Sequence, residues 1–199
     1  MRHPAIAVRA VLLCALAATA PPLAAQSAPR PTPDQIRASF AAHKGDFDYL
    51  LGDWEFTAVN RDYGRMHGFW SAVRLADGQV LDEYRIVGDS GVTYYVTRTL
   101  RVYNPARSEW DLVSTGDGLH DLGTGRREGD EMHIEQKFGM MTEQPSTWRI
   151  RYYDIRADRF SWSADRTTDE GKTWVAGFQT LEARRIDPPR DLGALTRSQ

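Results

Sequence analysis

The chain has 199 residues, a formal net charge of −2 and a single cysteine. A slightly acidic chain offers no basic field for nucleic acid or anionic lipid, so we expect no nucleic-acid partner. The length suffices for one domain with its own hydrophobic core, and one cysteine cannot form an intramolecular disulfide. Packing and hydrogen bonding must therefore hold the fold together.

Residues 1–25 have the pattern of a secretory signal peptide. Arg2 and Arg9 give a basic start, and an apolar run over 10–20 is too short to span a bilayer. Small residues at the end of this segment predict cleavage after Ala25. We therefore expect a periplasmic or secreted protein. No later apolar run could cross a membrane, so stable membrane insertion is not expected.

Residues 26–31 (QSAPRP) predict a disordered Pro/Ser linker. A helix should follow at Thr32, because Thr at the N-cap, Pro at the first helical position and Gln35 form a capping box. We predict short helices with one apolar side over 33–51, acting as an N-terminal plug. They would belong to a barrel domain over 32–186, with residues 187–199 as a tail.

From Asp53 onward the hydrophobic period changes to two, which is typical of strands. Turn signals such as Asp77-Gly78 and Asn104-Pro105 separate the runs. The expected strands are 53–60, 65–76, 79–87, 92–104, 108–115, 119–127, 131–138, 146–155, 158–166 and 173–185. Short connections favour pairing of sequence neighbours, and closure removes the sheet edges. We predict an all-β, antiparallel, up-and-down barrel of about ten strands.

The alternation also separates two faces on each strand. In 92–103 the more apolar face carries Arg98 among aliphatic and aromatic residues, so we expect that face inside. A cation inside a small barrel needs either an internal acid or a bound carboxylate as its partner. Inward aromatic residues could line a pocket around it. The candidate ligand-binding residues are Tyr94, Arg98, Trp148, Tyr152 and Trp162.

Gly52-Asp53-Trp54 opens the first strand and Arg184-Arg185 closes the last. This arrangement resembles the calycin group of barrels, the lipocalins and their relatives. In that group the Trp closes one end and a late Arg stacks across it by a cation–π contact. The resemblance implies structural roles for Gly52, Trp54 and Arg184.

Three longer stretches carry a second resemblance: FDYLLGDWEF (47–56), VYNPARSEW (102–110) and DRFSWSADRTTDEGKTW (158–174). Their order resembles a bacterial family of uncharacterised, calycin-like barrels known as a domain of unknown function. Nitrobindin-type haem barrels also begin with Gly-x-Trp, but their axial His lies late in the chain. Here no His follows His133, so haem binding by that route is disfavoured. We predict no cofactor, and no His-rich spacing predicts a metal site.

The stretch TTDEGKTW (167–174) is close to the Asp-box of sialidase-type propellers. Propellers repeat this motif, whereas this chain holds one copy, so we interpret it as a β-hairpin turn. Asp169 should accept hydrogen bonds from turn amides, Gly171 should adopt a positive φ, and Trp174 should pack. These three residues complete the predicted structural set.

The sequence is compatible with three hypotheses for the function. The leading hypothesis is a non-catalytic, lipocalin-like binding protein for a small hydrophobic or amphipathic molecule. One alternative is an enzyme with its site in the barrel mouth, which a close pair of inward acids would favour. The other is a structural or partner-binding barrel whose interior its own side chains fill.

Overall fold

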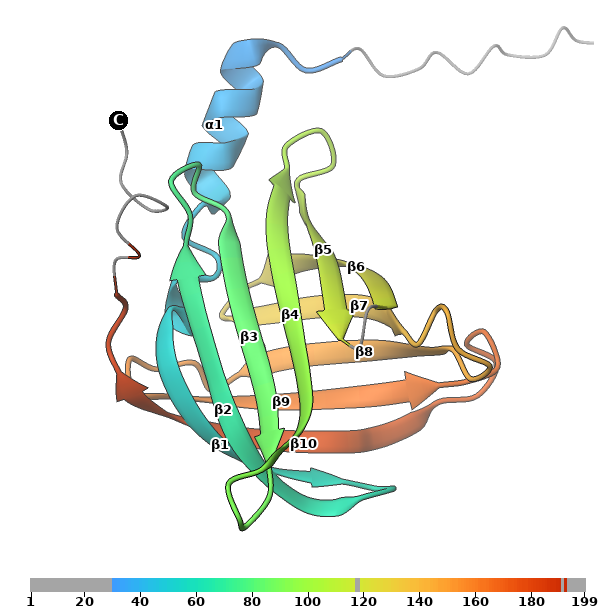
Figure 1. Cartoon of the computed structure of the whole chain (residues 1–199). Helices are drawn as coiled ribbons and strands as arrows, with labels where there is room; N and C mark the ends of the chain where they lie inside the picture. The colour runs from blue at the N-terminus through green and yellow to red at the C-terminus, as the bar shows by residue number, and fades with distance from the viewer. Residues whose placement is uncertain (1–29, 117–118, 191, 193–199) are drawn as a thin grey trace, which may run out of the picture. The chain divides into compact units, whose positions relative to one another are not determined.

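The computed structural model describes residues 30–116, 119–190 and 192. Within these residues the chain forms a helix α1 (Pro33–His43), a 3-10 turn η1 (Asp48–Leu50) and ten strands (Figure 1). The strands are β1 (Gly52–Asn60), β2 (Gly64–Arg74), β3 (Val80–Val87), β4 (Thr93–Asn104), β5 (Glu109–Gly116), β6 (Leu119–Glu128), β7 (Glu131–Phe138), β8 (Ser146–Tyr153), β9 (Arg159–Thr167) and β10 (Val175–Asp187). The expected signal peptide and most of the linker and tail lie outside the described residues.

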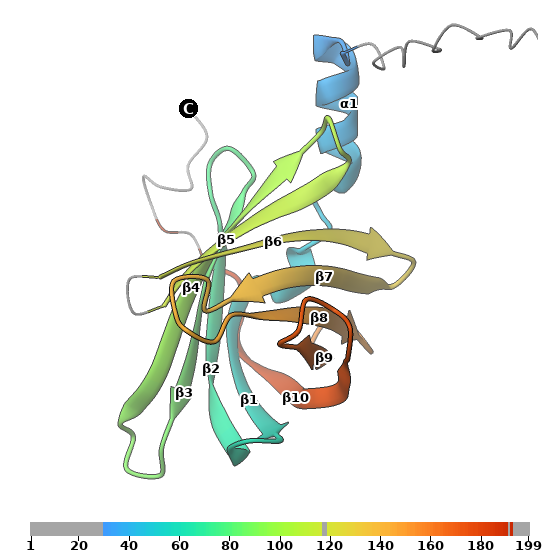
Figure 2. The ribbon, with the colours of Figure 1, turned by 90° about the vertical axis from the view of Figure 1, so that its right-hand side faces the viewer.

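The strands form a closed antiparallel barrel in which each strand pairs with its sequence neighbours. Closure comes from β10, which pairs with both β9 and β1 and lies between them in Figure 2. The predicted all-β barrel with a short N-terminal helix is confirmed, and its strand boundaries agree with the structure to within two residues. Within the described residues, no helix has the length and apolar character needed to span a membrane.

Helix α1 begins at the predicted capping box. The Thr32 side chain accepts from the Gln35 amide at 3.3 Å, and the Gln35 side chain accepts from the Thr32 amide at 2.8 Å. None of the helix residues is buried. Ser39 bonds to the Tyr103 hydroxyl at 2.8 Å, and the Phe40 ring packs 6.0 Å from the same Tyr. The helix therefore rests on the barrel through one edge.

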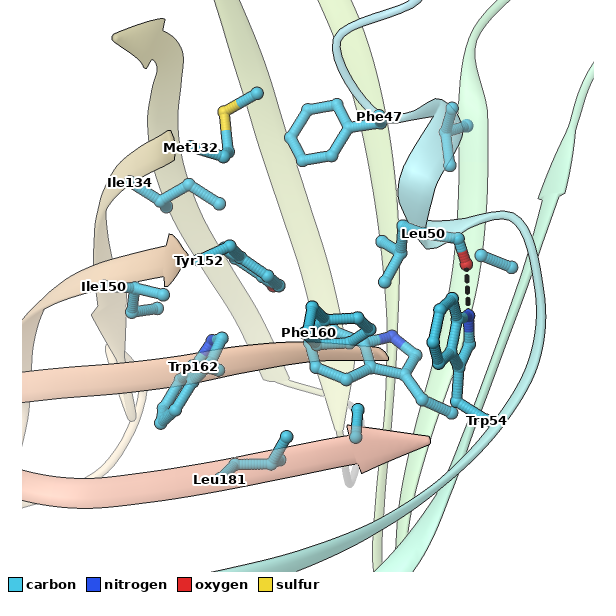
Figure 3. Packing of buried hydrophobic residues seen from close by; sticks show 14 of the residues in the cluster. Phe47, Leu50, Trp54, Met132, Ile134, Ile150, Tyr152, Phe160, Trp162 and Leu181 are labelled. Carbon is cyan, nitrogen blue, oxygen red and sulfur yellow. Dashed lines mark hydrogen bonds between the residues drawn. The ribbon is translucent and has the colours of Figure 1, made fainter. Parts of the chain in front are cut away.

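The apolar residues that close this end of the barrel follow the helix instead. Phe47 and Leu50 are fully buried beside Trp54 and Phe160 (Figure 3). Trp54 donates to the Leu50 carbonyl at 2.8 Å and packs edge-to-face on Phe160 at 4.8 Å. Phe47 meets Trp110 at 5.1 Å in the same geometry. We call this group, Phe47, Leu50, Trp54, Trp110 and Phe160, the plugged end.

Candidate ligand-binding site

The barrel contains a cavity of about 730 Å³ that extends from buried residues to solvent. At its inner end lie Trp70, Asp82, Arg101 and Tyr152, which we call the floor; each of the four is at most 5 % exposed. At its outer end lie Tyr63, Tyr94, Phe138, Trp148 and Phe178, which we call the mouth. Tyr63 and Tyr94 are 79 % and 73 % exposed, so the cavity opens there. Its volume is typical of small-molecule sites.

One wall of the cavity is polar. It consists of inward residues of β4, β5 and β7: Thr97, Thr99, Ser114 and Gln136. Gln136 donates to the Ser114 hydroxyl at 2.6 Å, and that hydroxyl lies 2.9 Å from the Thr99 hydroxyl. Because these side chains hydrogen-bond to one another, their orientations are fixed. The wall therefore presents donors and acceptors to a ligand in defined positions.

The other wall is aromatic and aliphatic. Tyr84 stacks on Phe56 at 4.7 Å, and Trp148 packs edge-to-face on Phe178 at 5.2 Å. Trp162 lies deeper, 6.4 Å from Trp148. Ile150, two residues after Trp148 on β8, adds an aliphatic surface, and Figure 3 shows it near Trp162. Flat rings on one side and hydrogen-bonding groups on the other make the cavity amphipathic.

A buried ion pair forms the floor. Arg101 Nε lies 2.6 Å from Asp82 Oδ2, and Trp70 donates its indole N–H to Asp82 Oδ1 at 2.8 Å. The Arg101 guanidinium also lies 4.6 Å over the Phe47 ring. Burial by itself would lower the pKa of Arg101, but the adjacent Asp82 carboxylate outweighs it and raises the pKa. The pair is therefore charged and internally compensated.

Three tyrosines in or beside the cavity, Tyr49, Tyr84 and Tyr152, have neutral phenols. Burial raises the pKa of Tyr84 and raises that of Tyr152 to about 12, although the Arg101 guanidinium opposes the shift at Tyr152. Burial likewise raises the pKa of Tyr49, whose ring packs edge-to-face on Tyr152 at 5.7 Å. At neutral pH these side chains supply hydrogen bonds and ring surface but no charge.

Three of the predicted ligand-binding residues line the cavity from the expected face: Trp148, Tyr152 and Trp162. Tyr94 also lines it, but at the mouth, on a largely exposed side chain. The expectation that Arg98 lies inside is wrong. Its side chain is 51 % exposed and pairs with Glu83 at 3.2 Å on the outer surface.

The cause of the Arg98 error is the register between β3 and β4. It shifts between Ile86 and Val87, so that Tyr95 pairs with Ile86 while Thr93 pairs with Val87. Tyr94, the residue between them, is the extra residue of a β-bulge. One extra residue reverses which side chains of the rest of β4 point inward. Beyond the bulge the inward residues of β4 are Thr97, Thr99, Arg101 and Tyr103.

Sequence reasoning missed the polar residues of the site, which are the polar wall and the floor pair of Arg101 and Asp82. A usable signal was present on β3, where Asp82 alternates with Val80 and Tyr84 on the apolar face. An acid in that position requires a buried cation nearby. Arg98 and Arg101 point to opposite faces of β4, so only one of them can lie on the same side of the sheet as Asp82.

The predicted role of Arg184 also needs correction. Arg184 points outward and pairs with Glu55, whereas Arg185 lies 4.0 Å over the Trp54 ring. Trp54 and Arg185 are directly paired across β1 and β10, which puts them on one face. A Cβ on Gly52 would lie 2.6 Å from the Arg185 guanidinium, so Gly at this position allows the close approach.

The hairpin at 167–174 has the expected local geometry. The Thr173 amide donates to Asp169 Oδ1 at 2.9 Å and the Thr173 hydroxyl to Oδ2 at 2.6 Å. Gly171 has φ 88°, and the Trp174 ring lies 3.9 Å beneath the Arg149 guanidinium. Trp174 precedes β10 and does not belong to it. Side-chain hydrogen bonds from Thr173 lower the pKa of Asp169 to about 2.

Two carboxylates are found among the described residues that line the cavity. Asp82 pairs with Arg101 at the floor, and Asp62 pairs with Arg166 at 2.9 Å near the mouth. In the part of the chain that the structure describes, no group of three or more His, Cys, Asp or Glu side chains could hold a metal ion. The histidines with described side chains, His43, His67 and His133, do not line the cavity.

No family model and no curated protein matches the chain. Solved structures with similar folds include Rv2717c from M. tuberculosis, with 17 % identity, a TM-score of 0.48 and coverage of 74 % of this chain and 96 % of that one. The S-type phycobiliprotein lyase CPES from Guillardia theta has 10 % identity, a TM-score of 0.49 and coverage of 79 % and 97 %. EF1p2_mFAP2b bound to DFHBI has 17 % identity, a TM-score of 0.34 and coverage of 71 % and 98 %.

These likenesses are to overall architecture at low identity, and they transfer no activity. The strand order itself establishes a closed barrel of ten antiparallel strands. Membership of the uncharacterised bacterial family stays a prediction.

Proposed function

We propose that this barrel is a non-catalytic binding protein for a small amphipathic molecule. The observation that carries the proposal is the cavity of about 730 Å³, closed by the plugged end and open at the mouth, with one polar and one aromatic wall. A barrel filled by its own side chains would have no such space. A ligand would lay its apolar face against Trp148 and Trp162 and turn its polar edge toward Thr97 and Gln136.

The arrangement of the acids favours binding over catalysis. Acid–base chemistry uses a carboxylate within hydrogen-bond reach of a reacting group and with a pKa suited to proton transfer. Both carboxylate oxygens of Asp82 accept hydrogen bonds, from Arg101 and Trp70. Asp62 is paired with Arg166 near the mouth of the cavity. The carboxylates therefore stabilise and orient cations of the cavity.

The test is ligand-induced stabilisation with a cavity-blocking variant. The purified protein would be scanned by thermal unfolding against a panel of neutral and charged aromatic and aliphatic amphiphiles. Ile86 lines the cavity on β3, and Leu81 on the same strand lies on the outer face. We expect at least one panel compound to raise the Tm of the wild type and of Leu81→Trp but not of Ile86→Trp. Stabilisation by no compound, or equal stabilisation of Ile86→Trp, would contradict the proposal.

We further propose that the protein acts outside the cytoplasm, because residues 1–25 combine a basic start, a short apolar run and a small-residue end. Fractionation of cells that express the full chain should find it in the periplasm or medium, starting at Gln26. An intact Met1 in the cytoplasmic fraction would contradict this.

A further inference from the structure

The chemistry of the floor and the mouth narrows the class of ligand. We infer that the cavity takes an uncharged, flat aromatic molecule with a carbonyl group, and that the carbonyl enters first and lies at the floor. This inference rests on the proposed function and adds the charge, shape and orientation of the ligand.

Charge compensation argues for an uncharged ligand. The described lining residues include two cations, Arg101 and Arg166, and two carboxylates, Asp82 and Asp62. They form two ion pairs, one at each end of the cavity. A ligand carboxylate placed on Arg101 would also lie beside Asp82 in a site of low dielectric, where like charges repel strongly. A ligand ammonium beside Asp82 would meet Arg101 in the same way.

Hydrogen-bond accounting at the floor argues for an acceptor. Both oxygens of Asp82 already accept bonds, from Arg101 and Trp70. By contrast, Arg101 Nη1 and Trp162 Nε1 have no acceptor of good geometry among the described residues. Buried donors without acceptors are unfavourable, so a group that accepts from them gains more than it would in water.

The two donors lie around one point. Tyr152 is close enough to both Arg101 and Trp162 for hydrogen bonds from each to act on its phenol. All three side chains line the cavity and are buried. An oxygen that binds at the Tyr152 hydroxyl would therefore lie near both other donors, whose side chains must turn toward it to bond. A carbonyl oxygen, with two lone pairs and no hydrogen, suits such a cluster of donors.

The aromatic wall argues for a flat ring system behind the carbonyl. Trp148 and Trp162 approach at 6.4 Å on one side, with Phe178 next to Trp148 at the mouth. Ring surfaces in these positions favour stacked or edge-to-face contact with another ring. The polar wall, beginning at Thr97, then faces the edge of the ligand.

Three compounds on one ring skeleton test the inference: 9-fluorenone, which is flat, neutral and has only a carbonyl; fluorene, which lacks it; and fluorene-4-carboxylate, which is charged. Calorimetric titration of the full-length protein into each compound would give the affinities. We expect fluorenone to bind at least about tenfold more tightly than either of the others, the effect of one or two buried hydrogen bonds.

Matched variants then locate the carbonyl. Trp162→Phe keeps a ring and removes the unpartnered N–H, and Tyr152→Phe removes the hydroxyl at the same point. In each variant we expect the preference for fluorenone over fluorene to fall to about threefold or less, whatever the change in the affinity for fluorene itself. Trp148→Phe is the control, because its N–H already donates to Ser146 at 3.0 Å, and it should retain the full preference.

The outcomes separate the two proposals. Equal binding of fluorenone and fluorene, tighter binding of the carboxylate, or an unchanged preference in Trp162→Phe and Tyr152→Phe would overturn the inference and leave the binding function standing. If all three compounds fail while another compound of the stabilisation panel binds, the inference alone falls. If no compound of any kind binds, both the inference and the proposed binding function are contradicted.

Discussion

The two ends of the barrel are built from the same ten strands but serve different purposes. At the plugged end, Trp54 and Trp110 are fully buried and tied by hydrogen bonds to neighbouring segments. At the mouth, Tyr63 in the β1–β2 turn and Tyr94 near the start of β4 are largely exposed to solvent. Dense packing concentrates stability at one end, which leaves the other free to form an open site. Matched substitutions at the two ends test this division.

Removing the central aromatic residue of the plugged end should have the largest effect. Trp54→Ala deletes a fully buried ring together with its bond to Leu50 and its contact with Arg185. We expect a loss of about 3–5 kcal/mol in the free energy of unfolding, measured by urea denaturation. At the mouth, Trp148→Ala should lose only about 1–2 kcal/mol, because the side chain is partly exposed. Equal losses would show that stability is shared evenly between the ends.

The floor lies between the two ends, and its ion pair should behave as a buried one. Arg101→Met leaves Asp82 charged and unpaired inside the barrel, so we expect a loss of about 3 kcal/mol or more. Arg98→Met removes the outward cation of the same strand and should change stability by less than about 1 kcal/mol. Urea unfolding of both variants checks the difference. A larger loss for Arg98→Met would mean that the faces of β4 are misassigned.

Two glycines with positive φ extend the comparison to the backbone. Gly52 has φ 102°, and a Cβ there would lie 2.7 Å from the Asp187 carbonyl oxygen as well as near Arg185. Gly64, which opens β2 after the turn that carries Tyr63, has φ 74° and nothing within 4 Å of such a Cβ. Gly52→Ala should therefore cost about 3 kcal/mol, and Gly64→Ala only about 1 kcal/mol of backbone strain. Thermal unfolding would measure both, and similar Tm shifts would contradict the assignment.

The smallest expected effect is the pH dependence of the hairpin between β9 and β10. The folded pKa of Asp169 is about 2, below the usual value of 3.8. Its contribution to stability is therefore fully present above about pH 4 and is lost as the pH falls through 2. The stability difference between wild type and Asp169→Asn should shrink over that window. A difference that is constant from pH 5 to pH 2 would argue against this role.

The sequence predicted the fold well because period-two alternation and turn residues are local signals. β7, β8 and β9 each carry one clearly apolar face, so Ile134, Tyr152 and Trp162 were placed correctly. Both faces of β4 combine apolar and polar residues, and each carries one arginine. The local hydrophobic pattern therefore does not determine which face points into the barrel. The choice depends on the bulge at Tyr94, which is a property of the β3–β4 pairing.

The candidate site was predictable only where its residues are apolar. Hydrophobic alternation finds Trp148 and Trp162 but does not find the polar wall. Thr97 lies on the less apolar face of its strand, and Gln136 shares the inward face of Ile134 without any apolar signal of its own. Arg101 and Asp82 meet through pairing of neighbouring strands, and their burial depends on the closed barrel around them. The choice between Arg184 and Arg185 likewise depends on the register of β1 with β10, which are far apart in sequence.

Arg185 has a kinetic consequence. Its guanidinium donates to the carbonyls of Leu51 and Tyr49, and its Nε to that of Ala157, which joins the two chain ends of the barrel across 134 residues. Contacts at such separation form after local hairpins, because the entropy of closing the loop opposes them. We expect Arg185→Met to accelerate unfolding several-fold in stopped-flow experiments and to leave the folding rate nearly unchanged. Arg185 would then act as a latch that sets the lifetime of the closed barrel.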